Sequence, residues 1–173
     1  MRSLILGGAR SGKSALAERL AHQSGREVVY IATAQAHDGE MAERIAHHRA
    51  RRPAHWRTVA APLALSAALN EHARADRFVL VDCLTLWMSN LLGDAAPDRL
   101  GAERDALLEI LPSLPGEIVL VSNEVGLGIV PMGELTRRFV DESGRLHQSL
   151  ASRCERVVFV AAGLPLALKG TLE

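Results

Sequence analysis

Short apolar runs alternate along the chain with longer segments whose apolar residues recur at helical spacing. The runs predict strands, which in chain order are Ser3–Leu6, Val28–Ala32, Phe78–Val81, Ile118–Val121 and Val157–Val160. The longer segments predict helices at Ser14–Gln23, Glu40–Arg51, Leu63–Ala73, Thr85–Leu92, Leu100–Leu111 and over most of Met132–Ser152. Strands that are apolar at every position are typical of a parallel sheet covered on both faces. The pattern therefore predicts an α/β fold with a mostly parallel sheet flanked by helices.

Length and composition place the chain among globular proteins of one domain. It has 173 residues, 48% of them apolar, and no visible repeat, so residues 1–173 are expected to form a single domain. Lys plus Arg and Asp plus Glu both number 20, and this zero net charge argues against nucleic acid as a partner. The first strand begins at Ser3 without the layout of a signal peptide, and no apolar run reaches membrane-spanning length. We therefore expect a cytoplasmic protein without a membrane span.

The most specific chemical signal is a glycine-rich loop between the first strand and the first helix, which fits GxxxxGK[ST] at every position. Such a loop lets backbone N–H groups converge on phosphate oxygens, and the following helix points its positive end at the anion. Lys13 is expected to act catalytically beside the β- and γ-phosphates of ATP or GTP, and the Ser14 hydroxyl is expected to bind Mg²⁺. The predicted nucleotide-binding residues of this loop are Gly7, Gly8, Ala9, Arg10, Ser11, Gly12, Lys13 and Ser14.

An acidic residue supports this interpretation. Asp82 directly follows the apolar run Phe78–Val81, and in P-loop proteins such a carboxylate lies beside the loop and helps to hold Mg²⁺. Asp82 is therefore predicted to bind both the nucleotide and the metal, together with Ser14. The alternative is a structural role, in which Asp82 caps the N-terminus of the predicted helix Thr85–Leu92.

A second candidate site lies in a basic segment. Two histidines, His47 and His48, lie among four arginines, Arg44, Arg49, Arg51 and Arg52. A neutral imidazole can attack a nucleotide phosphorus and form a phosphoramidate, which splits a group transfer into two steps. Nearby guanidinium groups would stabilise the phosphate oxygens and the departing pyrophosphate. The residue types fit this chemistry, but an ordinary solvated basic helix face explains them as well.

Longer motifs surround these sites. They include Arg44-Ile45-Ala46-His47-His48-Arg49, Asn123-Glu124-Val125-Gly126-Leu127-Gly128-Ile129-Val130-Pro131 and Ala162-Gly163-Leu164-Pro165. Together with the phosphate loop, they resemble one family, the bifunctional adenosylcobinamide kinase / adenosylcobinamide-phosphate guanylyltransferase of cobalamin biosynthesis. The likeness covers nearly the whole chain. The loop alone is generic, whereas the histidine string and the string that begins at Asn123 are far more specific.

The resemblance implies two reactions on one chain. ATP or GTP phosphorylates adenosylcobinamide, and GTP then donates GMP to the phosphate, which gives adenosylcobinamide-GDP and pyrophosphate. It implies that the first histidine of the pair, His47, carries the GMP, whereas chemistry alone also allows His48. It further implies a RecA-like P-loop NTPase sheet and a homotrimer with active sites near subunit contacts. The additional nucleotide-binding residues that it implies are Ala32, Thr33, Ala34, His48, Arg49, Ala50 and Arg51.

The sequence departs from the family pattern at two places, and two rival functions also fit the residues. The family usually has Glu shortly after the pair Arg57-Thr58, where residues 59–61 here are Val-Ala-Ala, and it often has Asn-Gln where residues 147–148 here are His-Gln. The rival functions are a plain P-loop small-molecule kinase without a covalent intermediate and a non-catalytic nucleotide-binding switch. The proton acceptor of the kinase step is also open, with Asp82 and Glu124 as candidates by position.

Overall fold

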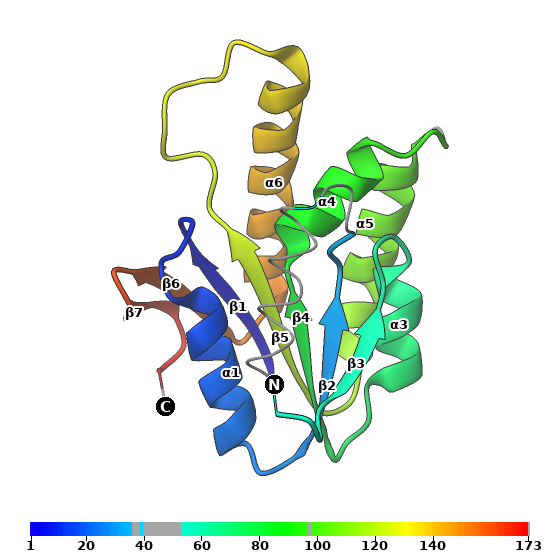
Figure 1. Cartoon of the computed structure of the whole chain (residues 1–173), viewed down its shortest axis with the longest axis vertical. Coiled ribbons are helices and arrows are strands. Elements are labelled where there is room, and N and C mark those ends of the chain that lie inside the picture. The colour runs from blue at the N-terminus through cyan, green and yellow to red at the C-terminus, as the bar shows by residue number, and fades with distance from the viewer. Residues whose placement is uncertain (36–38, 40–52, 97, 173) are drawn as a thin grey trace.

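The computed structural model describes residues 1–35, 39, 53–96 and 98–172, which form the helices and strands of an α/β fold (Figure 1). The strands are β1 (Arg2–Gly7), β2 (Glu27–Ala32), β3 (Arg57–Ala60), β4 (Arg77–Asp82), β5 (Glu117–Asn123), β6 (Arg156–Ala161) and β7 (Leu164–Lys169). The helices are α1 (Lys13–Gln23), α3 (Leu65–His72), α4 (Leu84–Leu92), α5 (Arg99–Ile110), which continues into a 3₁₀ turn at Leu111–Ser113, and α6 (Glu134–Arg153). Among the described residues, no helix combines the length and the apolar character needed to cross a membrane.

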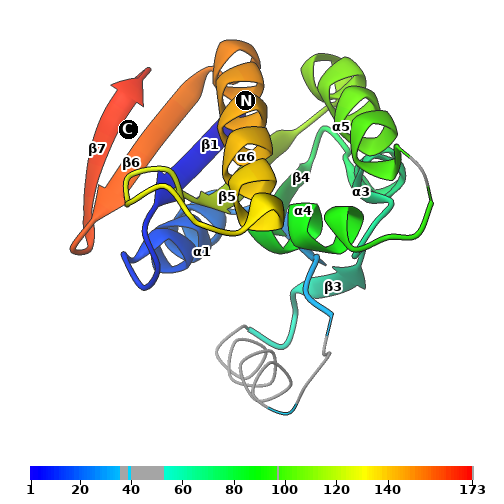
Figure 2. The ribbon, with the colours of Figure 1, turned by 90° about the horizontal axis from the view of Figure 1, so that it is seen from above.

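The described strands form one sheet in the spatial order β3-β2-β4-β5-β1-β6-β7. All neighbours pair in parallel except β7, which pairs antiparallel with β6 at the edge. Helix α1 covers one face of the sheet, and α3, α4, α5 and α6 cover the other (Figures 1 and 2). This arrangement confirms the predicted α/β class with a mostly parallel sheet flanked by helices.

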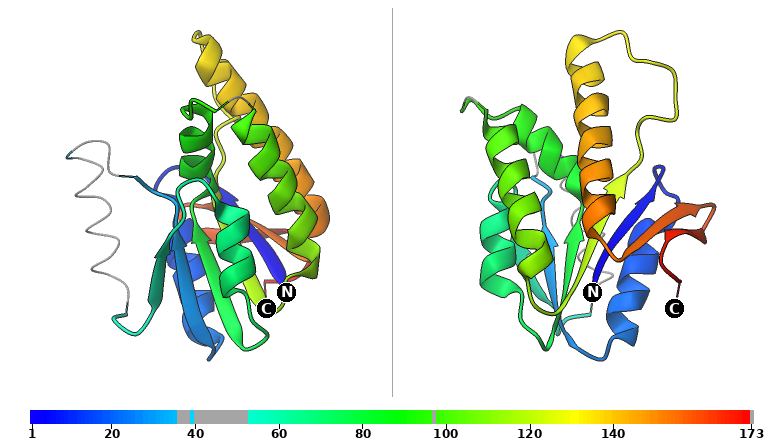
Figure 3. Two further views of the ribbon diagram at one scale, coloured as in Figure 1. Left: turned by 90° about the vertical axis from the view of Figure 1, so that its right-hand side faces the viewer. Right: turned by 180° about the vertical axis from the view of Figure 1, so that it is seen from behind.

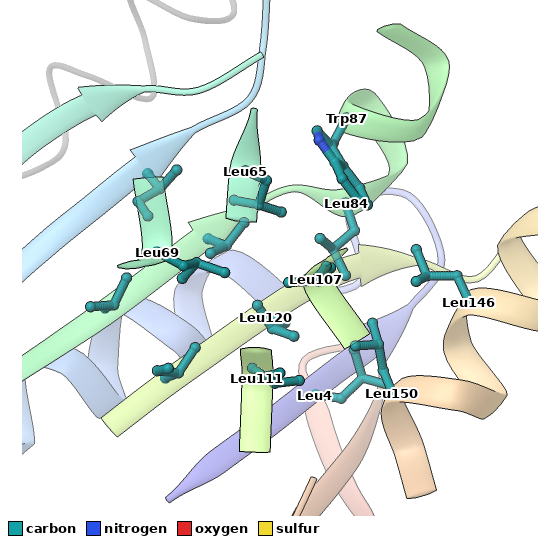
Figure 4. Close-up of a cluster of buried hydrophobic side chains, with 14 of the residues drawn as sticks. Leu4, Leu65, Leu69, Leu84, Trp87, Leu107, Leu111, Leu120, Leu146 and Leu150 are labelled. Carbon is teal, nitrogen blue, oxygen red and sulfur yellow. The ribbon is translucent and has the colours of Figure 1, made fainter. Parts of the chain in front are cut away.

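The central strands bury side chains on both faces, because helices cover each face. Leu4 and Leu120 belong to the apolar cluster beneath α3–α6, whereas Ile5 and Val119 belong to the cluster beneath α1. Figure 4 shows the first cluster, in which leucines from β1, β5 and the four covering helices meet. Full burial of one such side chain stabilises a fold by about 1.5–3 kcal/mol. The two clusters therefore hold the helices and the sheet in fixed relative positions.

The hydrophobic pattern misses two edge strands. Strand β3 has exposed or half-buried side chains at all four positions and so gives no apolar run. The prediction that Val157–Val160 is the last strand is wrong, because β7 follows and pairs with β6. An edge strand tolerates Pro165 and exposed leucines, since one side of its backbone has no neighbouring strand. The predicted helix Glu40–Arg51 lies outside the described residues.

The sheet brings candidate residues from distant parts of the chain to one edge. In its register, Gly7 at the end of β1 lies opposite Asn123 at the end of β5, and Ala32 at the end of β2 lies opposite Asp82 at the end of β4. Strand β5 stands between β1 and β4. Because open α/β sheets bind ligands outside the C-terminal ends of their parallel strands, this edge is the place to look for the functional site.

Candidate nucleotide site

The phosphate loop connects β1 to α1 in a conformation that requires glycine at two positions. Gly7 and Gly12 have φ angles of 154° and 101°, values that side chains disfavour. A Cβ at Gly7 would lie 2.3 Å from the carbonyl oxygen of Val160, and a Cβ at Gly12 would lie 3.1 Å from Cα of Gly163. The N–H of Gly163 also donates to the carbonyl oxygen of Ser11 at 2.8 Å. The turn between β6 and β7 therefore supports the loop from outside.

Helix α1 begins at Lys13, so the last two residues of the loop motif form its first turn. Its N-cap residue is Gly12, no side chain caps its first turn, and that turn contains no acidic residue. Its first backbone N–H groups are therefore free to bind an anion, which the helix dipole also favours. Ser11 Oγ is buried and has no hydrogen-bond partner among the described residues, so it offers the loop a further polar contact. These features match the phosphate-binding role predicted for the loop.

Lys13 is the main cation of the site. Only 6% of its surface is exposed, and its Nζ donates to the carbonyl oxygen of Gly8 at 2.6 Å. Burial lowers the pKa of Lys13, and the charge of Asp82 opposes this shift in part. Burial raises the pKa of the Cys83 thiol to about 11, with Asp82 adding to the shift, so this neighbouring group is neutral at pH 7. A phosphate at the loop would add negative charge and favour the ammonium form of Lys13.

Asp82 ends β4 and interacts electrostatically with Lys13. Its Oδ2 accepts a hydrogen bond from the Tyr30 hydroxyl at 2.9 Å, which orients the carboxylate. The alternative role of Asp82 as a helix cap is wrong, because the N-cap of α4 is Cys83 and no side chain caps that helix.

The oxygen donors at this edge suit Mg²⁺. Asp82 supplies a carboxylate, and Ser14, in the first turn of α1, supplies a hydroxyl. Both are hard oxygen ligands, and Mg²⁺ is commonly held by only one or two protein groups together with water and phosphate oxygens. No group of three or more His, Cys, Asp or Glu side chains that could hold a metal occurs within the part of the chain that the structure describes. The residues present therefore fit a metal that binds together with the nucleotide.

The residues after β2 lie at the same edge, but they differ in their contacts. Thr33 is fully buried, and its Oγ1 donates to the carbonyl oxygen of Cys83 at 2.7 Å and accepts from the N–H of Cys83 at 3.0 Å. Asn90 Nδ2 donates to the carbonyl oxygen of Thr33 at 2.8 Å. The Thr33 side chain thus joins the end of β2 to the end of β4. Its neighbours Ala32 and Ala34 are half-buried and have no polar side-chain atom that could form such a bond.

A polar cluster beside the loop joins Glu124, a candidate proton acceptor by its position, to three side chains that no sequence pattern connects with it. It consists of Thr85 on α4, Ser122 on β5, Glu124 just after β5 and His147 on α6. Ser122 Oγ lies 2.8 Å from His147 Nε2 and 3.3 Å from Thr85 Oγ1. Glu124 Oε2 lies 3.7 Å from His147 Nδ1, and the N–H of Glu124 donates to the carbonyl oxygen of Gly7 at 3.0 Å. The sequence contains two signals for this cluster, the polar Ser122 at the end of an apolar run and the carboxylate of Glu124 just after it.

The predicted nucleophile and its neighbours, His47, His48, Arg49, Ala50 and Arg51, lie outside the described residues. The described residues that precede this segment, Ala34 and Gln35, follow the C-terminal end of β2.

A parallel sheet with a complete GxxxxGK[ST] loop after one strand and an acidic residue at the end of another defines a P-loop nucleotide-binding protein. A solved structure, that of the RadB recombinase, shares this fold with a TM-score of 0.53, and the match covers 91% of this chain and 73% of that one. The sequence identity of that pair is 18%, so the likeness shows the fold alone.

Sequence comparison identifies the family within this class. Residues 3–168 match the family described as cobinamide kinase / cobinamide phosphate guanyltransferase, CobU. The bifunctional adenosylcobalamin biosynthesis protein CobP of Pseudomonas aeruginosa is 69% identical over 170 residues, which cover 98% of each chain. The bifunctional adenosylcobalamin biosynthesis protein CobU of Escherichia coli is 42% identical over 182 residues, with 98% of this chain and 100% of that protein covered. The chain therefore belongs to the cobinamide kinase / cobinamide phosphate guanyltransferase family and is a transferase of cobalamin biosynthesis.

Proposed function

We propose that this chain catalyses two successive transfers to one substrate. It phosphorylates adenosylcobinamide with ATP or GTP, and it then transfers GMP from GTP to adenosylcobinamide phosphate, which yields adenosylcobinamide-GDP and pyrophosphate. The observation that carries the proposal is the placement of a complete phosphate loop, the buried Lys13 and Asp82 at one edge of the sheet in a chain of this family. The related proteins CobP and CobU are both named bifunctional, which supports two activities on one chain.

The kinase step needs the substrate hydroxyl and the γ-phosphorus to meet in line. Backbone N–H groups of the loop and of α1 hold the phosphates, and Lys13 directs its ammonium group at them. The hydroxyl oxygen forms a bond to the γ-phosphorus, the bond from that phosphorus to the bridging oxygen breaks, and the nucleoside diphosphate departs. Lys13 and the N–H groups stabilise the charge that develops on the oxygens. Ser14 and Asp82 would hold Mg²⁺, which when bound supplies further positive charge to the phosphate oxygens.

The guanylyl step proceeds in this proposal through His47. A ring nitrogen of His47 attacks the α-phosphorus of GTP, a phosphoramidate bond forms, and pyrophosphate leaves. An oxygen of adenosylcobinamide phosphate then attacks the same phosphorus, the nitrogen–phosphorus bond breaks, and the imidazole is restored. His48 and the arginines Arg49 and Arg51 follow directly in the sequence and would contact the nucleotide, together with Ala32 and Ala34. The loop holds the triphosphate during the first of these attacks.

The wild-type protein provides the first test of this proposal. Incubation with GTP is expected to raise the intact mass by one GMP residue, through a bond that acid hydrolyses and base does not. Later addition of adenosylcobinamide phosphate is expected to remove the added mass and yield adenosylcobinamide-GDP. A plain small-molecule kinase would phosphorylate its substrate without gaining mass, and a nucleotide-binding switch would form neither product. Either of these results would contradict the guanylyl step.

The proposal includes a homotrimer that works in the cytoplasm, where ATP and GTP are available. The segment between β5 and α6, together with the first turn of α6, supports a contact between copies, because it exposes an unusual number of large apolar side chains. The exposed fractions are 80% for Leu127, 97% for Ile129, 73% for Val130, 95% for Met132 and 64% for Leu135, and we call these residues the apolar loop. Monomeric proteins rarely expose so many large apolar side chains together. Figure 3 shows the segment, coloured yellow, extending away from the sheet.

Charged residues in the apolar loop are expected to dissociate the oligomer. We expect the double substitution Ile129→Glu and Met132→Glu to shift the molar mass in solution from a trimer towards a monomer, because burying unpaired carboxylates in an interface is unfavourable. Light scattering coupled to size exclusion measures this directly. Ala102→Glu, an equivalent change on the exposed surface of α5, is the control and is expected to leave the trimer intact. A wild-type protein that is monomeric at micromolar concentration would contradict the proposal.

A further inference from the structure

Glu124 is held beside the phosphate loop through both its backbone and its side chain. Its N–H donates to the carbonyl oxygen of Gly7 at 3.0 Å, which ties it to the first residue of the loop. Its Oε1 accepts a hydrogen bond from the N–H of Gly126 at 2.6 Å, and its Oε2 lies 3.7 Å from His147 Nδ1. The Glu124 side chain is still 23% exposed. The carboxylate is therefore oriented and at the same time accessible to a substrate.

The hydrogen bonds of the polar cluster have one consistent direction. The N–H of Asn123 donates to Thr85 Oγ1 at 2.7 Å, and Thr85 Oγ1 lies 3.3 Å from Ser122 Oγ, where the Thr85 hydroxyl can donate. Ser122 can then donate its own proton to His147 Nε2 at 2.8 Å. A neutral imidazole that accepts at Nε2 carries its proton on Nδ1. The cluster thus accommodates the tautomer of His147 whose N–H is directed at Glu124.

His147 is neutral in this arrangement. Its side chain is 7% exposed, and burial lowers the pKa of His147, although Glu124 raises it in part. Nδ1 is buried without a hydrogen-bond partner among the described residues, 3.7 Å from the Glu124 carboxylate. A buried N–H without a partner costs free energy, so a small side-chain movement that completes this hydrogen bond is favourable. His147 therefore restrains the carboxylate of Glu124.

The two acidic residues at this edge have different surroundings. Asp82 accepts a hydrogen bond from the Tyr30 hydroxyl and interacts electrostatically with Lys13. Its strand, β4, is separated from β1 by β5. Glu124 instead follows β5, the immediate neighbour of the strand that leads into the loop. We propose that Glu124 is the proton acceptor of the kinase step and that His147 is the residue that positions it.

This assignment rests on the proposed function and completes its kinase step. As the substrate hydroxyl oxygen bonds to the γ-phosphorus, its proton passes to the Glu124 carboxylate, and the nucleoside diphosphate leaves with the bridging oxygen. Glu124 later returns the proton to water. The guanylyl step uses an imidazole lone pair and a phosphate oxygen, neither of which must lose a proton before it attacks. Glu124 is therefore needed for the first reaction and dispensable for the second.

The test measures the two reactions separately in the full-length protein. Glu124→Gln is expected to lower kinase kcat by about 10²–10⁴-fold, the usual contribution of a general base, while KM for ATP changes little. GMP loading, followed by intact mass after incubation with GTP, is expected to equal that of the wild type. Glu109→Gln, on the exposed surface of α5, makes the same chemical change away from both the phosphate loop and the apolar loop and is expected to keep wild-type values.

The positioning role of His147 is tested through its effect on catalysis by Glu124. His147→Leu is expected to lower kinase kcat by about tenfold or more, because a displaced catalytic group loses its alignment. His147→Asn keeps an N–H donor near the position of Nδ1 and is expected to restore kcat to within about threefold of the wild type. In a Glu124→Gln background, His147→Leu is expected to cause no further loss of kinase kcat. If His147 had a merely structural role, its substitution would lower kcat in this background as well.

Each result decides the proposal. A Glu124→Gln protein within about threefold of wild-type kinase kcat would overturn it, and so would additive losses in the double variant. If His147→Leu does not fold, the comparison passes to His147→Asn, for which a large loss of kcat in a folded protein would overturn the positioning role. A wild type that phosphorylates no adenosylcobinamide contradicts the proposed function as well. Absence of GMP loading in an active kinase contradicts only the guanylyl step.

Discussion

Replacing Lys13 with alanine is expected to remove both activities, with kcat/KM lower by about 10³-fold or more in each reaction. Lys13 is the buried cation of the phosphate loop, and its Nζ is already oriented by the carbonyl oxygen of Gly8. In the proposed mechanism both reactions place a triphosphate in the same loop, so both are expected to lose the positive charge that stabilises the oxygens in the transition state. Initial rates of adenosylcobinamide phosphate formation and of GMP loading measure the two losses independently.

The other lysine of the chain supplies the control. Lys169 lies on β7, and its Nζ donates to the carbonyl oxygens of Ala151 and Ser152 on α6. Lys169→Ala removes the same charge from a place outside the site and is expected to leave both rates unchanged. Retention of more than about a tenth of either activity by a folded Lys13→Ala protein would show that the loop is not the shared phosphate site.

Thermal unfolding separates lost chemistry from lost structure in the Lys13→Ala protein. An ammonium group that is buried in the free protein loses hydration, as the lowered pKa of Lys13 indicates. Removing it is therefore expected to leave the melting temperature of the nucleotide-free protein unchanged or higher. The stabilisation by added ATP or GTP is expected to disappear, because a ligand stabilises the folded state only at concentrations near or above its Kd.

The parts of the fold that could be predicted from sequence are those specified by local patterns. The apolar runs of β1, β4 and β5 are continuous, and each is buried on both faces as predicted. The glycines of the phosphate loop also carry a local signal, since Gly7 and Gly12 have positive φ angles that other residues disfavour. Asp82 was found for the same reason, because its carboxylate stands out at the end of an apolar strand.

The rest of the site could not be predicted because it depends on contacts between residues that are far apart in sequence. Ser122 meets Thr85 across 37 positions and His147 across 25, and no short motif contains these three residues. The contact between Gly163 and the phosphate loop is hidden for a further reason. It belongs to the turn before β7, an edge strand whose Pro165 and exposed leucines do not produce a strand pattern.

The polar cluster also gives a physical meaning to one departure from the family pattern. The family often has Asn at the position of His147, and both side chains can present an N–H donor to Glu124. His147 can in addition accept a hydrogen bond from Ser122 through Nε2, which lies 2.8 Å from Ser122 Oγ. The departure is therefore expected to preserve the donor while it adds a connection to β5.

Replacing His47 with alanine is expected to separate the two activities of the chain. Loss of a covalent nucleophile removes the enzyme–GMP bond, so the mass gain after incubation with GTP is expected to vanish and guanylyl transfer to fall by about 10³-fold or more. The kinase step transfers the γ-phosphoryl group directly to the substrate hydroxyl and is expected to keep its kcat within about threefold. Intact mass and kinase rate, measured on the same preparation, give both results.

His48→Ala is the matched control, because it removes the same ring from the next position in the sequence. Residues that are adjacent on a helix point about 100° apart, so on the predicted helix the two imidazoles would not reach the same phosphorus. We therefore expect His48→Ala to gain the GMP mass and to transfer it, with a lower rate if His48 contacts the nucleotide. The reverse result, GMP loading that survives in His47→Ala and is lost in His48→Ala, would assign the nucleophile to the second histidine and leave the two-step chemistry in place. Loading that survives in both single variants would instead require a nucleophile elsewhere and would contradict a histidine intermediate in this segment.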